Sequence, residues 1–319
     1  MCLRGLHNRE EGLAKNLTLD SGDVQLAGRD FGGVGPPLIL IHGLGGTVLD
    51  WSLLAPLLTA QHHVVGFDLR GHGESGDGEW TWASALADVA AVADVVGEPN
   101  PAIVGHSLGG MLAAMWGADH PECPGVVNLD GHGRRRPDQL VGLAPAAAVD
   151  QLQELDDWLA GARAESAGPL DGTQVDALLD QYRALAAHAG APEELLLAMA
   201  RRGLRRAKDG TRLRPDPGGL AGEIMAAAAE FDMLDLYARL ECPLLIFLAE
   251  APPAFGAVPS RVQELMALYR TGLARDLAHL AERQANVRIF PVDASHALII
   301  ERPIILAGAI NDFLAIAPS

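Results

Sequence analysis

Ser107 is the residue whose setting first suggests chemistry, because it lies in the run Gly105-His-Ser-Leu-Gly109. The pattern G-x-S-x-G places a serine on a sharp turn between a strand and a helix, where flanking glycines avoid collisions with neighbouring backbone. The apolar segment Ala102-Ile-Val104 precedes this run, and a helical pattern opens at Leu112. We therefore expect the Ser107 hydroxyl to face solvent and act as a nucleophile. The alternative is a serine in an ordinary strand-helix turn.

A glycine-rich loop, His42-Gly-Leu-Gly-Gly46, follows another apolar segment upstream. Such a loop can aim backbone N–H groups at a developing negative charge, which an acyl-transfer site requires. The donors that we predict for this oxyanion hole are the backbone amides of Leu44 and of Leu108, the residue after the nucleophile. A dinucleotide fingerprint G-x-G-x-x-G is the competing interpretation, and it fails because Val48 replaces the third glycine.

The elements that must position these residues alternate between short apolar strands and helical patterns, which indicates a mostly parallel sheet wrapped by helices. The predicted strands cover Pro37–Ile41, His63–Asp68, Pro101–Gly105, Gly125–Leu129, Pro243–Leu248 and Asn286–Val292. The predicted helices among them cover Asp50–Leu58, Thr81–Val96, Leu112–Asp119 and, near the end of the chain, Arg302–Leu314.

The strand signal disappears from Gly131 to Gly219, where Ala- and Leu-rich helical patterns replace it. Helices are expected there over Ala147–Ala162, Val175–Ala187 and Pro192–Arg206. We therefore predict a first core segment at residues 1–133, an inserted helical cap at 134–240 and a second core segment at 241–319.

Three motifs, in this order and spacing, resemble the α/β-hydrolase fold family. They are His42-Gly43 after a strand, Asp68-Leu-Arg-Gly-His-Gly-Glu-Ser75, and Gly105-His-Ser-Leu-Gly-Gly110. The resemblance implies an α/β fold with a mostly parallel sheet, flanking helices and a helical cap inserted after strand 6. It is strongest to the serine-nucleophile branch of esterases, lipases and haloperoxidase-like proteins. Epoxide hydrolases and haloalkane dehalogenases look similar but carry an aspartate nucleophile, so Ser107 argues against both.

His296 is predicted to be the general base, because it lies in the loop after the last predicted strand and before a Glu301-Arg-Pro303 helix start that also resembles the family. A serine needs such a base within hydrogen-bond reach, and imidazole titrates near neutrality. Histidines 42, 72 and 106 are interpreted as turn or packing residues beside the site. The charged turn containing Asp68 and Glu74 is interpreted as structural.

The triad acid is where the sequence departs from the family pattern. After the Pro243–Leu248 strand the family usually carries an aspartate, but the stretch Ala249-Glu-Ala-Pro252 has proline at that position. Asp130 is our preferred acid, because it ends an apolar strand and is followed by a glycine that lets the chain turn. Glu250 remains the alternative, with Asp293 a distant third. Asp130 could also be a strand-end residue that caps the following loop.

Composition restricts the remaining possibilities. A net charge of −17 argues against a nucleic-acid partner, which requires a concentrated basic surface. No run approaches the roughly 18 apolar residues of a membrane span. The first residues lack the apolar centre of a secretory signal, so a cytoplasmic protein is expected. The three cysteines and eleven histidines show no metal-ligand spacing, so neither a metal nor a cofactor is expected.

Cations concentrate in the predicted cap. Arg134-Arg-Arg136 follows Asp130, and a second group gathers at residues 201–208. They could bind an anionic group of a substrate, or they could form a solvated face at a helix end, where the helix dipole favours cations.

These observations lead to two classes of function. The first is a serine hydrolase that forms an acyl-enzyme on Ser107, acting on a small-to-medium carboxylic ester, thioester or lactone with an apolar acyl part. The second is a non-hydrolytic use of the same fold, as a lyase, acyltransferase, cyclase or ligand-binding receptor. The oligomeric state is left open by these patterns.

Overall fold

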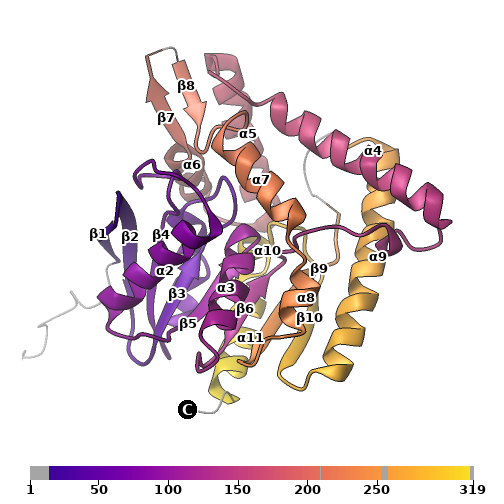
Figure 1. The fold of residues 1–319 in the computed structure, drawn as a ribbon. Helices are drawn as coiled ribbons and strands as arrows, with labels where there is room; N and C mark the ends of the chain where they lie inside the picture. The colour runs from indigo at the N-terminus through magenta and orange to yellow at the C-terminus, as the bar shows by residue number, and fades with distance from the viewer. Residues whose placement is uncertain (1–13, 209, 253–257, 317–319) are drawn as a thin grey trace, which may run out of the picture.

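The computed structural model describes residues 14–208, 210–252 and 258–316 of the chain (Figure 1). Within these ranges eight strands form one sheet in the order β1-β2-β4-β3-β5-β6-β9-β10. From β4 to β10 each strand is parallel to its neighbours. At one side of the sheet β2 pairs antiparallel with both β1 and β4. The strands are β1 (Lys15–Ser21), β2 (Val24–Gly32), β3 (Pro37–Ile41), β4 (His63–Phe67), β5 (Ala102–His106), β6 (Val126–Leu129), β9 (Leu244–Ala249) and β10 (Val287–Val292).

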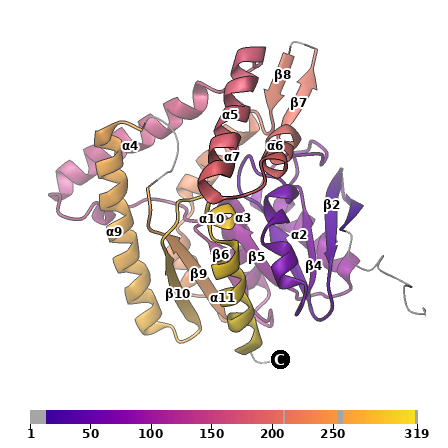
Figure 2. The same cartoon turned by 180° about the vertical axis from the view of Figure 1, so that it is seen from behind.

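Helices cover both faces of this sheet (Figures 1 and 2). Successive strand residues point to opposite faces, so Ile39 and Ile41 join one buried apolar cluster while Leu38 and Leu40 join another. The first cluster includes side chains of α2 (Trp82–Val96), α3 (Leu108–Asp119), α8 (Met233–Tyr237) and α9 (Ser260–Arg283). The second includes side chains of η1 (Val48–Ser52), α1 (Ala55–Leu58), α10 (Leu298–Glu301) and α11 (Pro303–Ile316).

A mainly helical segment stands between β6 and β9 and lies beyond one end of the sheet, at the top in Figure 1. It contains η2 (Pro137–Gln139), α4 (Pro145–Ala164), α5 (Gly172–Ala189), α6 (Glu193–Arg202), the pair β7 (Leu204–Ala207) and β8 (Gly210–Leu213), and α7 (Leu220–Glu230). The division of the chain at residues 133 and 240 stays a prediction. No helix within the described ranges is long and apolar enough to cross a membrane.

One expectation for this segment is wrong. The helix predicted to run to Arg206 ends at Arg202, and an antiparallel hairpin follows in a region where no strand was expected. Arginines have good helix propensity, which favoured continuing the helix. Gly210, which begins β8 with φ 140°, has a poor helix propensity that opposes such a continuation.

Candidate active site

Ser107 lies on a strained turn between β5 and α3. Its backbone angles are φ 53° and ψ −116°, outside the usual regions for a residue with a side chain. The turn requires glycine on both sides, since a Cβ on Gly105 would lie 1.9 Å from the Gly109 carbonyl oxygen. A Cβ on Gly109 would lie 2.1 Å from the carbonyl oxygen of Ile41. The helix α3 starts at Leu108, directly after the serine, rather than at the predicted Leu112.

The loop after β3 lies against this turn, because a Cβ on Gly43 would be 3.0 Å from the Ser107 Cβ. His42 holds the loop through two hydrogen bonds. Its Nδ1–H donates to the Gly43 carbonyl at 2.7 Å, and its Nε2 accepts from the Leu69 N–H at 2.9 Å. Burial lowers the pKa of His42 to about 4, so the ring is neutral near pH 7 and can make both bonds.

The predicted oxyanion donors have free backbone N–H groups. Leu108 is the first residue of α3, where helix N–H groups have no partner inside the helix. Within the described ranges neither the Leu44 N–H nor the Leu108 N–H donates to an acceptor. Both groups are therefore available to a bound oxygen atom.

His296 follows β10 and contacts Asp130, which follows β6. The distance from His296 Nδ1 to Asp130 Oδ2 is 2.7 Å. With Nδ1–H donating to the carboxylate, His296 Nε2 is left as the proton acceptor. The alternative acid, Glu250, is an exposed side chain after β9, and Asp293 is exposed as well. Among the described residues, Asp130 is the carboxylate that lies against His296.

Asp130 is a mostly buried carboxylate, 14% exposed, with three hydrogen-bond partners. Besides the contact with His296, its Oδ1 accepts the Ala249 N–H at 3.0 Å and lies 3.3 Å from His132 Nε2. Burial by itself would raise the pKa of Asp130, but the hydrogen bonds from His132 and His296 outweigh it and lower that pKa. Desolvation likewise opposes the charged form of His296, but the hydrogen bond to Asp130 and its negative charge raise the pKa of His296.

Two further contacts hold the loop that carries His296. His106 Nε2 lies 2.8 Å from the His296 carbonyl oxygen, and burial, followed by the proximity of His296, lowers the pKa of His106 to about 3. Glu301 accepts from the Ser295 N–H at 2.8 Å and from the Ser295 hydroxyl at 2.6 Å. His106 was expected only as a packing residue near the site, and Glu301 was noted only as a helix start.

A cavity of about 150 Å³ opens beside Asp130 and His296. Much of its wall comes from α9, a helix that was not predicted, together with α4 and the loop after β6. The lining side chains include Leu155, Leu159, Met266, Tyr269, Arg270, Leu273, His132 and Arg135. The sequence signal for α9 is present, because buried Val262, Leu265, Leu273, Leu277 and Leu280 recur at helical spacing.

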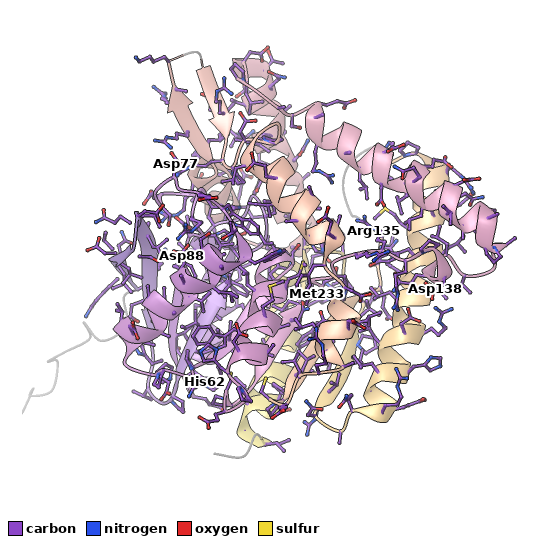
Figure 3. All side chains as sticks on the ribbon, viewed as in Figure 1. His62, Asp77, Asp88, Arg135, Asp138 and Met233 are labelled. Atoms are coloured by element: carbon purple, nitrogen blue, oxygen red, sulfur yellow. The ribbon has the colours of Figure 1, made fainter. Side chains whose placement is uncertain are left out.

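The charged turn after β4 makes structural contacts. Asp68 is fully buried and accepts the Val48 N–H at 2.7 Å and the Glu74 N–H at 2.8 Å. The Arg202 guanidinium, at the end of α6, also pairs with Asp68 and with the Glu74 carboxylate. Arg205 pairs similarly with Asp77, which lies below the β7–β8 hairpin in Figure 3. This part of the cation-rich segment docks onto the core.

The family model described as alpha/beta hydrolase fold matches residues 36–212, more than half of the chain. The chain belongs to the α/β-hydrolase fold family. The match spans the loop after β3, the Ser107 turn and Asp130. Relatives of this α/β hydrolase include proteins named as hydrolases.

Two curated relatives resemble short stretches of this α/β hydrolase. A fluoroacetate dehalogenase of a Burkholderia species is 32% identical over 119 residues, which cover 35% of this chain and 38% of that protein. A (lyso)-N-acylphosphatidylethanolamine lipase of Mus musculus is 35% identical over 92 residues, 27% of each chain. The chain therefore spans well under half the length of these relatives.

Solved structures match the fold over almost the whole chain. An E-2-(acetamidomethylene)succinate hydrolase superposes with a TM-score of 0.69 at 19% identity, covering 95% of this chain and 100% of the other. The enol-lactonase of Burkholderia xenovorans LB400 superposes with a TM-score of 0.59 at 21% identity, covering 94% and 100%. At these identities the likeness concerns the fold alone.

Proposed function

We propose that this enzyme is a serine hydrolase that cleaves a small-to-medium carboxylic ester, thioester or lactone through an acyl-enzyme on Ser107. The observation that carries the proposal is the 2.7 Å contact between His296 Nδ1 and Asp130 Oδ2. That contact leaves His296 Nε2 as a base. Ser107 follows β5, which pairs with β6, the strand before Asp130, and it lies in a turn typical of nucleophiles.

In the proposed reaction, the Ser107 oxygen attacks the substrate carbonyl carbon while His296 Nε2 accepts the hydroxyl proton. The backbone N–H groups of Leu44 and Leu108 stabilise the negative oxygen of the tetrahedral intermediate. His296 then donates its proton to the departing oxygen or sulfur, which becomes an alcohol or thiol group, and the acyl group stays on Ser107. Water, deprotonated by His296, attacks the acyl carbon, and His296 returns that proton to the Ser107 oxygen as the acid leaves. Asp130 stabilises the imidazolium in both halves of the cycle.

The lining and the volume of the cavity support a substrate with an apolar acyl part. Leu155 and Leu159 of α4 and Leu273 of α9 form apolar walls next to His296. A cavity of about 150 Å³ accommodates a short acyl chain rather than a polymer. We further propose that the enzyme acts in the cytoplasm without a nucleic-acid partner, which the net charge of −17 supports.

The experiment that tests this function is the Ser107→Ala substitution. Turnover of activated esters should fall by several orders of magnitude, because the acyl-enzyme cannot form. A fluorophosphonate probe should label the wild type once, on the peptide that contains Ser107, and should not label the variant. Circular dichroism and thermal melting of the variant provide the folding control.

Three results would count against this function. Substantial turnover by folded Ser107→Ala protein would exclude the serine mechanism. A wild type that takes no probe would do the same. A wild type that takes the probe but hydrolyses no ester, thioester or lactone would favour the non-hydrolytic alternatives, of which an acyltransferase uses the same acyl-enzyme.

A further inference from the structure

Two arginines line the cavity beside Asp130 and His296. Arg135 comes from the loop after β6 and Arg270 from α9, and most of the other lining side chains are apolar. Figure 3 shows Arg135 on the side of the molecule where α4 and α9 lie. A guanidinium in such surroundings is costly unless an anion compensates it, so the partners of both arginines matter.

Arg135 already has an acidic partner. Its guanidinium pairs with Asp156 of α4, and it lies 5.7 Å from the centre of the Tyr269 ring. The partner carboxylate is 42% exposed, so this pair stands at the rim of the cavity. Arg135 therefore brings little uncompensated charge to the interior.

Arg270 has no acidic partner within the described part of the chain. Its one hydrogen bond runs from Nη1 to the carbonyl oxygen of Ala251 at 3.0 Å. Residues 253–257 carry no acidic side chain in the sequence. Burial lowers the pKa of Arg270, although the negative charge of Asp130 opposes this. A guanidinium offers several N–H donors in a planar fork, and most of those on Arg270 have no acceptor among the described residues.

The acidic groups around the cavity are already engaged. Asp130 accepts from His296, His132 and the Ala249 backbone, and Asp156 pairs with Arg135. Arg270 is thus a partly buried cation at the candidate catalytic centre that forms no ion pair with a carboxylate of the described residues. Planar, bidentate recognition of a carboxylate is the task for which an arginine fork is best suited.

We propose that Arg270 binds a carboxylate carried by the substrate, so that the substrate class is an ester whose short apolar acyl chain ends in a carboxylate. This proposal rests on the serine hydrolase function above. The methylenes of the acyl chain lie against Leu155, Leu159 and Leu273, and the terminal carboxylate reaches Arg270. Monoesters of short dicarboxylic acids have this chemistry.

The test compares matched esters in which a carboxylate replaces a methyl group. Monoethyl succinate, glutarate and adipate are paired with ethyl butanoate, pentanoate and hexanoate, and kcat/KM is measured for each. At the best chain length the wild type should prefer the monoester by about ten- to hundredfold, the range expected for hydrogen bonds to a charged group. The Arg270→Gln variant should bring this ratio close to one, and Arg270→Lys should retain part of it.

Arg275→Gln is the matched control. Arg275 lies on the same helix and carries the same charge, but it pairs with Asp276 away from the cavity. Its loss should leave the ratio unchanged. A wild type without a preference for the monoester would overturn the proposal. So would an Arg270→Gln variant that slows both members of a pair by the same factor.

A binding measurement separates this proposal from the hydrolase function. Monoethyl glutarate is titrated calorimetrically into Ser107→Ala protein and into Ser107→Ala/Arg270→Gln protein. Binding that requires Arg270 supports the carboxylate site even if the wild type hydrolyses no ester, in which case only the hydrolase function fails. Equal binding or no binding by the two proteins, alongside ester turnover by the wild type, contradicts the carboxylate site alone. No binding and no turnover contradict both.

Discussion

Asp130 uses both carboxylate oxygens in the candidate site, one for His296 and one for the Ala249 N–H and His132. Its backbone adopts φ 57°, an uncommon conformation for a residue with a side chain. This turn follows β6 and aims the carboxylate across β9 toward the loop after β10. The geometry therefore favours Asp130 over Glu250 as the residue that orients the imidazole.

Replacing Asp130 by asparagine should lower turnover of an activated ester by roughly three to four orders of magnitude. The amide cannot hold the tautomer in which His296 Nε2 accepts a proton. Glu250→Gln is the control, and because Glu250 is exposed, it should change turnover by less than about twofold. Steady-state kinetics on folded variants give the answer. The opposite ranking would assign the acid to Glu250.

The pH profile should report the protonation of His296. Only the neutral ring can accept the Ser107 proton, so kcat/KM should rise with pH. Asp130 raises the pKa of His296, so the midpoint should lie above the ordinary value of about 6.5. In Asp130→Asn the residual activity should show a lower midpoint, since the negative charge is gone. A flat profile, or an unchanged midpoint in the variant, would argue against this role.

Residues in compact motifs could be predicted, whereas contacts between distant segments could not. Ser107 lies in a five-residue pattern, and His296 is recognisable from the end of the last strand. The contact between His296 and Asp130 joins residues 166 positions apart, and it depends on β6 lying beside β9. Sequence reasoning therefore preferred Asp130 but kept Glu250 as an alternative. Arg270 was not found at all, because its helix was not predicted.

At the scale of elements, α6 is fixed to the core by a buried ion pair. Asp68 is fully buried, and the Arg202 side chain is 13% exposed. Removing one partner of such a pair leaves an uncompensated charge, which commonly costs about 3–5 kcal/mol. Arg202→Met should therefore lower the free energy of unfolding by roughly that amount, as measured by urea denaturation.

Arg206→Met serves as the control for this ion pair. Arg206 is exposed on the neighbouring strand β7, so its loss should change the free energy of unfolding by less than about 0.5 kcal/mol. Equal effects of the two substitutions would mean that the ion pair does not fix α6 to the core.

The central parallel strands were predicted within one or two residues, because each is a short apolar run bounded by turn residues. The antiparallel strands β1 and β2, at one side of the sheet, were not predicted. Their burial alternates along the chain, and polar residues interrupt the apolar signal. The hairpin β7–β8 was missed for a related reason, since its strands are arginine-rich and lie mostly at the surface.

At the scale of the whole molecule, the loops at the carboxyl ends of the strands contain buried histidines that stay neutral. Burial lowers the pKa of His42 to about 4 and that of His72 to about 3, and His106 behaves similarly. Unfolding exposes these rings to water, where histidine titrates near 6.5. Below that pH the unfolded chain binds protons that the folded chain does not, so the folded state loses stability as the pH falls.

Asp50 works in the opposite direction. Burial raises its pKa to about 7, so below that pH the folded chain keeps a proton that an unfolded aspartate releases above about pH 4. Burial also lowers the pKa of His62, so the histidines with a lowered pKa outnumber the one aspartate with a raised pKa. The free energy of unfolding should therefore fall with pH between about pH 6 and 4.5, by roughly 1.4 kcal/mol per pH unit for each excess proton bound by the unfolded chain.

Two substitutions should change this slope in opposite directions, which distinguishes linkage from a general loss of stability in acid. His72→Gln removes a group that the folded chain keeps neutral, so the slope should decrease by about 1.4 kcal/mol per pH unit. Asp50→Asn removes the opposing proton, so the slope should increase by a similar amount. Urea unfolding followed by tryptophan fluorescence at several pH values measures both. The slope is the decisive quantity, because either substitution also shifts stability by a pH-independent amount when it alters packing. Parallel curves for the wild type and both variants would contradict the assignment of these buried groups as the source of acid sensitivity.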